Sequence, residues 1–144
     1  MNDQLNDILG KKGHEVFKID AGASVLDAVR EMVRANVGSL LVTEGGEVTG
    51  IVTERDYLRR VALEGRTEQE TAVREISSSP LIVATPETTV DECMALMTDR
   101  RIRHVPVVND DGVIGIVSIG DLVKFRSEQQ GFELRYLSEY IAAY

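Results

Sequence analysis

Two short motifs in the sequence place a hydroxyl group and a carboxylate three residues apart. Thr53 precedes Asp56 in the first half of the chain, and Ser118 precedes Asp121 in the second half. A carboxylate accepts two hydrogen bonds at once, which suits the adjacent 2′- and 3′-hydroxyls of a ribose. Where a strand passes into a helix, the first backbone N–H groups of the helix also favour an anion such as phosphate. Both motifs are therefore candidates for binding a nucleotide.

The same spacing has a purely structural explanation. Many helices begin with a hydroxyl residue followed three positions later by an acid that reaches back to cap the first turn. Taken singly, either motif favours capping. What favours ribose binding is that both motifs follow a Gly-Ile-Val stretch, at residues 50–52 and 115–117, in equivalent places of an internal repeat.

The repeat relates residues 16–60 to residues 81–125 at a constant shift of 65 and without a gap. Each copy starts with a short apolar stretch that is typical of a strand and ends in turn residues. A helix is predicted next, because a hydroxyl cap and an acid three positions later precede an apolar face of helical period. These caps are Ser24 with Asp27 and Thr89 with Glu92, and the predicted first strands are residues 16–19 and 81–83.

The second part of each copy predicts a hairpin and a closing helix. Turn residues that tolerate positive φ separate two apolar runs at residues 44–46 and 109–112. A helix then begins near Arg55 or Asp121. Each copy is thus β-α-β-β-α, an α/β (α+β) unit of about 45 residues that buries its sheet poorly alone. We therefore expect the two copies to pack as one pseudo-two-fold module.

The repeat also predicts the division of the chain. We expect a first domain over residues 12–64, a linker over residues 65–79, a second domain over residues 80–126 and a C-terminal helix over residues 127–144. Part of the linker, at residues 71–76, is predicted as a helical turn. The aromatic C-terminal helix either covers the core of its own chain or packs against a second subunit, and the sequence leaves both alternatives open.

Composition excludes several classes of function. The net charge is −8 and each half of the chain is acidic, so binding to nucleic acid or to an anionic membrane is not expected. Cys93 is the only cysteine, which rules out an internal disulfide and favours a reducing compartment, expected to be the cytoplasm. No stretch has the length and apolar character of a signal peptide or a membrane span.

The repeat order and three sequence stretches resemble a pair of CBS (cystathionine β-synthase) domains of the stand-alone type. The stretches are the endings Gly-Ile-Val-Thr-Glu-Arg-Asp and Gly-Ile-Val-Ser-Ile-Gly-Asp, and Arg-Ile-Arg-His-Val-Pro-Val at residues 101–107. The resemblance covers about residues 12–126. It implies paired clefts that take AMP, ATP, NAD or S-adenosylmethionine without a required metal, and commonly a homodimer. Leu41, where the second copy has proline, and Ser77 depart from the family pattern.

The resemblance also assigns ligand roles to residues that by themselves indicate only a core or a loop. It places the adenine between apolar positions, near the backbone of a Ser-Pro pair. Side chains alternate between the two faces of a strand, so the strand that follows residue 102 directs one of two basic residues toward the cleft. The first copy has small neutral residues at the equivalent positions. The two sites should therefore differ in charge. These further site residues are Phe17, Val37, Gly38, Ser79, Pro80, Ile82, Ile102, Arg103 and His104.

Three functions fit these features to different degrees. The favoured hypothesis is a regulatory sensor that binds an adenine nucleotide and signals its ligand state to a partner protein. The alternative is a ligand-free dimerisation or scaffold module whose aspartates are only helix caps. An enzyme is poorly supported, because His14, His104 and Cys93 have no metal-ligand spacing and no nucleophile-base motif or glycine-rich phosphate loop is present.

Overall fold

A computed structural model describes residues 3–130, and these residues belong to two compact units. The repeat-1 unit is Val16–Ile82, and the repeat-2 unit combines Met1–Glu15 with Val83–Tyr144. Each unit therefore contains one copy of the sequence repeat together with a chain segment that precedes the other copy. The fold is of the mixed α/β class that the repeat predicts, with two small sheets.

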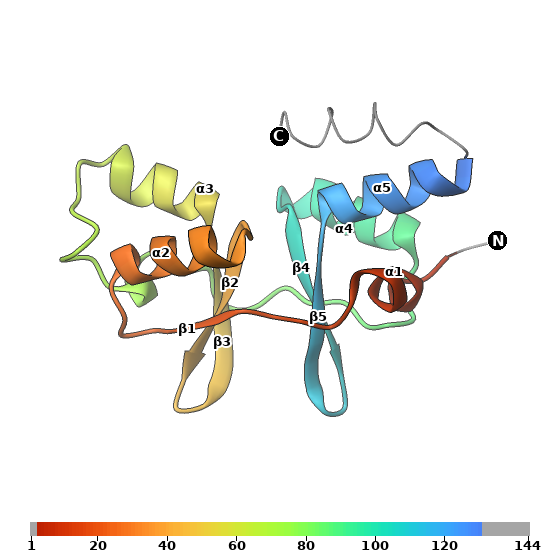
Figure 1. The fold of residues 1–144 in the computed structure, drawn as a ribbon, viewed down its shortest axis with the longest axis horizontal. Coiled ribbons are helices and arrows are strands. Elements are labelled where there is room, and N and C mark those ends of the chain that lie inside the picture. The colour runs from red at the N-terminus through yellow and green to blue at the C-terminus, as the bar shows by residue number, and fades with distance from the viewer. Residues whose placement is uncertain (1–2, 131–144) are drawn as a thin grey trace. The chain divides into compact units, whose positions relative to one another are not determined.

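The repeat-1 unit is built on a three-stranded sheet of order β1-β2-β3, with α2 beside it (Figure 1). Strand β1 is parallel to β2, and β2 is antiparallel to β3. After β3 the chain enters a short α-helix that continues as a π-helical segment, η1, and a 3₁₀ turn, η2, follows. The elements are β1 (Lys18–Asp20), α2 (Val25–Ala35), β2 (Ser39–Glu44), β3 (Glu47–Thr53), α3 (Glu54–Tyr57), η1 (Leu58–Ala62) and η2 (Val73–Glu75).

The repeat-2 unit holds the antiparallel pair β4-β5 and three helices. Figure 1 shows the N-terminal helix α1, drawn in red, beside β5 and α5, although more than 90 residues separate them in sequence. The elements are α1 (Leu5–Lys12), α4 (Val90–Arg100), β4 (His104–Asn109), β5 (Gly112–Ser118) and α5 (Ile119–Gln130).

Both predicted helix caps are confirmed. The Asp27 N–H donates to Ser24 Oγ over 3.1 Å at the start of α2, and the Glu92 N–H donates to Thr89 Oγ1 over 3.1 Å at the start of α4. At Thr89 the bond is reciprocal, because its backbone N–H donates to the Glu92 carboxylate over 2.9 Å. The predicted hairpins form as well, and each contains a bulge at the same place in the repeat, at residues 42–43 and 107–108.

The prediction of a strand at residues 81–83 is wrong, because the structure forms no strand there. In the first copy the Leu41 N–H donates to the Phe17 carbonyl over 2.9 Å and holds β1 against β2. Pro106 occupies the equivalent position in the second copy and has no N–H, so this bond cannot form there. Only an isolated bridge from Ala84 to β4 remains, with the Ala84 N–H donating to the Pro106 carbonyl over 3.0 Å.

Each unit has its own buried apolar cluster. In the repeat-1 unit, Val73 and Ile76 from the segment expected as a linker are fully buried with the side chains of α2, β2 and β3. The helical turn expected at residues 71–76 is confirmed by η2. The described part of the expected C-terminal helix, residues 127–130, belongs to α5, whereas residues 131–144 lie outside the described residues.

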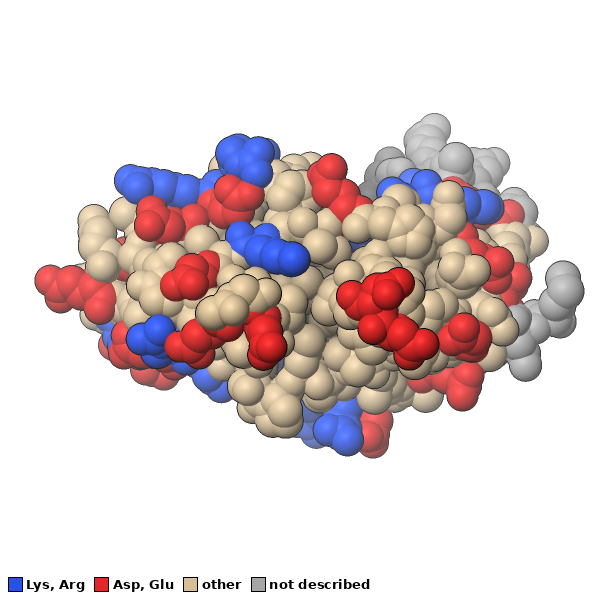
Figure 2. Space-filling model, turned by 90° about the horizontal axis from the view of Figure 1, so that it is seen from below, with Lys and Arg blue, Asp and Glu red and all other residues tan. Residues whose placement is uncertain are grey.

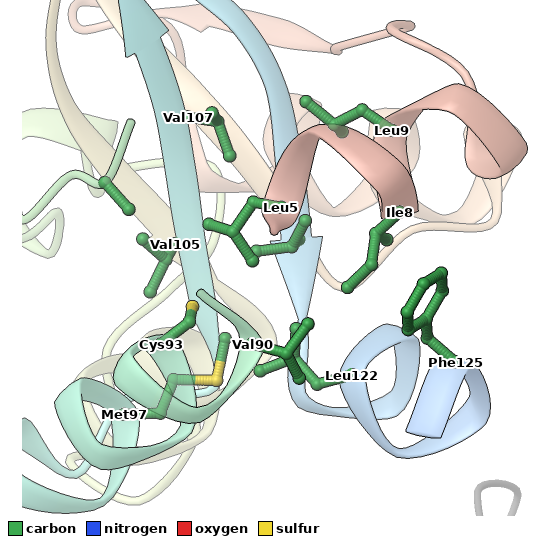
Figure 3. Packing of buried hydrophobic residues seen from close by; sticks show 12 residues of the cluster. Leu5, Ile8, Leu9, Val90, Cys93, Met97, Val105, Val107, Leu122 and Phe125 are labelled. Carbon is green, nitrogen blue, oxygen red and sulfur yellow. The ribbon is translucent and has the colours of Figure 1, made fainter. Parts of the chain in front are cut away.

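The apolar face of α1 belongs to the core of the repeat-2 unit. Figure 3 shows Leu5, Ile8 and Leu9 of α1 directed toward side chains of α4, β4 and α5. Leu5 and Leu9 are fully buried, so the packing of three α1 side chains holds this helix in place. Among the residues from 3 to 130, no helix is both long and apolar enough to cross a membrane.

Candidate functional site

The Ser118–Asp121 motif lies where β5 passes into α5. The Ser118 N–H donates to Asp121 Oδ2 over 2.8 Å, and the Asp121 N–H donates to Ser118 Oγ over 3.1 Å. Both side chains are half-buried. The motif thus caps α5 reciprocally, as the structural explanation of the sequence requires.

The Thr53–Asp56 motif has the same geometry where β3 passes into α3. Asp56 Oδ2 accepts hydrogen bonds from the Thr53 N–H over 2.9 Å and from Thr53 Oγ1 over 3.1 Å. The Asp56 N–H donates to Thr53 Oγ1 over 3.2 Å. In both motifs the cap uses Oδ2, and no hydrogen bond within the described chain reaches Oδ1. One carboxylate oxygen in each copy therefore keeps its capacity to accept from a ligand.

Three of the further site residues lie next to these motifs through backbone contacts. The Glu54 N–H donates to the Gly38 carbonyl over 3.1 Å, and the Ile119 N–H donates to the Arg103 carbonyl over 2.9 Å. In the same way, His104 pairs with Ser118 across the β4-β5 ladder. The structure thus brings Gly38 to the first motif, and brings Arg103 and His104 to the second.

His104 is neutral at physiological pH. Its pKa is lowered to about 4, first because burial disfavours the imidazolium and then because the cations of Lys12 and Arg103 repel it, while the Asp121 carboxylate acts in the opposite direction. His104 can therefore offer a hydrogen bond but no positive charge. Of the two basic residues predicted at this site, Arg103 alone contributes a cation.

Lys12 is a residue of this site that the sequence reasoning missed. Its Nζ lies 2.6 Å from Asp121 Oδ2 and donates over 2.7 Å to the Ile116 carbonyl. The contact joins residues 109 positions apart, and Lys12 precedes the aligned repeat window. The repeat places Ser77 at the equivalent position of the second copy, so comparison of the two copies does not indicate a lysine here. Only the packing of α1 reveals its role.

The residues that the family resemblance assigned to adenine are not joined to the motifs by any hydrogen bond within the described chain. Three of them, Phe17, Val37 and Ile102, are half-buried and pack against the core of their own unit. Ser79 and Pro80 are exposed, and Ile82 is half-buried. Their adenine role stays a prediction.

Groups for other chemistry are sparse in the described residues. Within residues 3–130 no cluster of three or more His, Cys, Asp or Glu side chains could hold a metal ion. Burial raises the pKa of the Cys93 thiol to about 11, which makes it a poor nucleophile at neutral pH. The face drawn in Figure 2 mixes acidic and basic side chains and shows no continuous basic stripe.

Comparison with known proteins identifies the class to which this fold and these motifs belong. The family model described as "CBS domain" matches the chain twice, at residues 7–63 and 73–128. These matches cover more than half of the chain, and the chain therefore belongs to the CBS domain family. Each match includes the segment before its repeat, which the structure packs into the other unit.

Individual relatives extend this result. The chain is 48% identical over 123 residues to a mitochondrial CBS domain-containing protein, CBSX3, of Arabidopsis thaliana. The match covers 82% of this chain and 60% of that protein, so the chain spans less than two thirds of the plant relative. A solved CBS-domain structure from Burkholderia ambifaria, described as a candidate signal-transduction protein, shares 40% identity with a TM-score of 0.85, covering 90% and 98% of the two chains. A hexameric CBS-CP12 protein from bloom-forming cyanobacteria shares 33% identity with a TM-score of 0.77, covering 85% and 71%. The protein is thus similar to CBS-pair proteins, generally regulatory and ligand-sensing modules.

Proposed function

We propose that the protein is a regulatory module that binds an adenine nucleotide, AMP, ATP or NAD, and presents its ligand state to a partner protein. The observation that carries the proposal is the geometry of the two aspartates. In each copy the carboxylate is held at a strand-to-helix junction through Oδ2, while Oδ1 has no partner within the described chain. Such a fixed, half-buried acceptor suits the paired hydroxyls of a ribose.

Holding the carboxylate in advance has a physical benefit for binding. An aspartate that must be ordered by its ligand loses side-chain entropy on binding, whereas a capped aspartate has already lost it on folding. Because the carboxylate accepts the ribose hydroxyls directly, no metal ion is required. Capping and ligand binding are therefore compatible uses of the same side chain.

The proposal is tested by separating the cap from the ligand. Asp56→Ala and Asp121→Ala remove a cap and the ribose acceptor together. Glu92→Ala is a matched control, because Glu92 caps α4 with the same reciprocal geometry and stands in neither motif. Calorimetric titration with AMP, ATP, NAD and S-adenosylmethionine should show binding to the wild-type protein and to Glu92→Ala, and weakened binding to each aspartate variant. Absence of binding to the purified wild-type protein at millimolar ligand would reject the proposal.

The second candidate function is a ligand-free dimerisation or scaffold module. The observation in its favour is that both aspartates cap a helix, which is a sufficient structural reason for their presence. This function predicts that Asp56→Ala and Asp121→Ala lower the melting temperature equally with and without nucleotide. A loss seen only as reduced stabilisation by the nucleotide excludes it.

Association and compartment belong to the same proposal. We expect a homodimer. The hexameric state named for the cyanobacterial relative supports self-association as such, and largely exposed apolar side chains on the repeat-1 unit, Val33 at 76% and Leu63 at 81%, provide apolar surface for it. Sedimentation equilibrium measures this state directly. For the compartment we propose the reducing cytoplasm. Because the plant relative is named as mitochondrial, fractionation of the native cell is the test that distinguishes the two compartments.

A further inference from the structure

Lys12 ends helix α1 and carries a donor that its own contacts leave unused. A lysine ammonium has three N–H donors. Two of them are used within the repeat-2 unit, by Asp121 Oδ2 and by the Ile116 carbonyl. The side chain is 35% exposed, and the described residues supply no acceptor for the third N–H. Because Leu9 on the same helix is fully buried, the position of Lys12 is set by the core.

The ion pair does not block the oxygen that a ribose would use. Lys12 contacts Asp121 Oδ2, the oxygen that already accepts from the Ser118 N–H, and it leaves Oδ1 without a partner within the described chain. What the ion pair changes is the charge. A bare carboxylate repels the phosphate of a nucleotide bound beside it, whereas a carboxylate paired with an ammonium does not.

The surroundings of Asp121 add to this effect. Lys12 and Arg103 both act as cations on His104, which places two positive charges and one carboxylate around the same imidazole. Within the described residues no ion pair reaches Asp56, where the repeat places Ser77 at the position of Lys12. The two aspartates therefore differ in electrostatic environment although their capping geometry is the same.

We propose that Lys12 makes the Asp121 site selective for phosphorylated adenine nucleotides over the uncharged nucleoside, by neutralising the carboxylate and donating its third N–H to a phosphate oxygen. The inference rests on the proposed function and names the ligand class of one of its two sites. A hydrogen bond to a charged group contributes enough to change affinity by about tenfold or more. The Asp56 site lacks this lysine, because the repeat places Ser77 at the equivalent position.

The test compares adenosine with AMP in a background where the Asp121 site alone is intact. Asp56→Ala supplies this background, and Lys12→Met removes the ammonium while keeping an unbranched side chain of nearly the same length. Lys11→Met is the matched control on the same helix, since the Lys11 side chain is 65% exposed and lies 3.9 Å from Glu128. Lys12→Arg retains the charge. Calorimetry measures both dissociation constants for each protein, and thermal melting verifies that each is folded.

The expected result is a change in the ratio of the two dissociation constants. Lys12→Met should reduce the preference for AMP over adenosine by about tenfold or more, while Lys11→Met leaves it unchanged and Lys12→Arg keeps most of it. An equal loss for both ligands, or an unchanged ratio, overturns the inference but leaves the proposed function standing. If the wild-type protein binds neither compound, the proposed function itself fails and the inference fails with it.

Discussion

The glycines of the two Gly-Ile-Val stretches offer a test of how far equivalent sequence positions share an environment. Gly50 in β3 and Gly115 in β5 are related by the repeat. A Cβ on Gly50 would lie 2.6 Å from the backbone oxygen of Ser78, whereas a Cβ on Gly115 would lie 2.7 Å from the Cδ2 methyl of Leu9. Alanine therefore meets backbone at one position and the end of a flexible side chain at the other.

The expected cost follows from what must move. Two backbone hydrogen bonds join Ser78 to Ile51. The Ser78 carbonyl accepts from the Ile51 N–H over 3.2 Å, and the Ser78 N–H donates to the Ile51 carbonyl over 2.9 Å. Relief of the clash in Gly50→Ala disturbs these bonds, each of which contributes about 1 kcal/mol, in addition to about 1–3 kcal/mol for overpacking. We expect Gly50→Ala to cost about 3–5 kcal/mol if both bonds are lost, and Gly115→Ala about 1–2 kcal/mol.

Urea unfolding and thermal melting measure both variants, and each kcal/mol corresponds to roughly 2–4 °C in Tm for a chain of this size. Leu9→Ala is the diagnostic partner, because it removes the methyl groups that a Cβ added at Gly115 would strike. The double variant Leu9→Ala/Gly115→Ala should be less destabilised than the sum of its single changes. An equal cost at the two glycines, or strict additivity of Leu9→Ala with Gly115→Ala, would refute the assigned contacts.

Two further predictions concern titratable groups. The pKa of His104 is about 4 in the folded protein, and its ordinary value is 6.5. Between these two pH values the unfolded chain binds one proton more than the folded protein. The contribution of the neutral His104 to the free energy of unfolding is therefore full above pH 6.5 and is lost as pH falls toward 4. His104→Gln should make the urea midpoint less sensitive to pH over this window, and a variant profile parallel to that of the wild type would contradict the assignment. Cys93, buried and with a pKa raised to about 11, should react with iodoacetamide at pH 8 only after unfolding in urea, whereas rapid alkylation of the folded protein would show that the thiol is accessible.

Much of the fold could be predicted because its signals are local. The caps at Ser24 and Thr89 depend on residues three positions apart, and the hairpins depend on turn residues between two apolar runs. The aspartates of the candidate site were found in the same way, since Asp56 and Asp121 stand in short motifs that the repeat duplicates. The missing strand at residues 81–83 was predicted wrongly because its pairing depends on the absent N–H of Pro106, a residue in a different element.

The repeat from which the candidate site was derived determined, by itself, the class of fold, the place of both aspartates and the expectation that their surroundings differ. Only the tertiary structure decided how they differ. It packed α1 into the repeat-2 unit and residues 65–79 into the repeat-1 unit, which brought Lys12 to Asp121, Leu9 to Gly115 and Ser78 to Gly50. The physical reason is that a periodic sequence records which residues are apolar, whereas the choice of core for each segment depends on contacts between residues far apart along the chain.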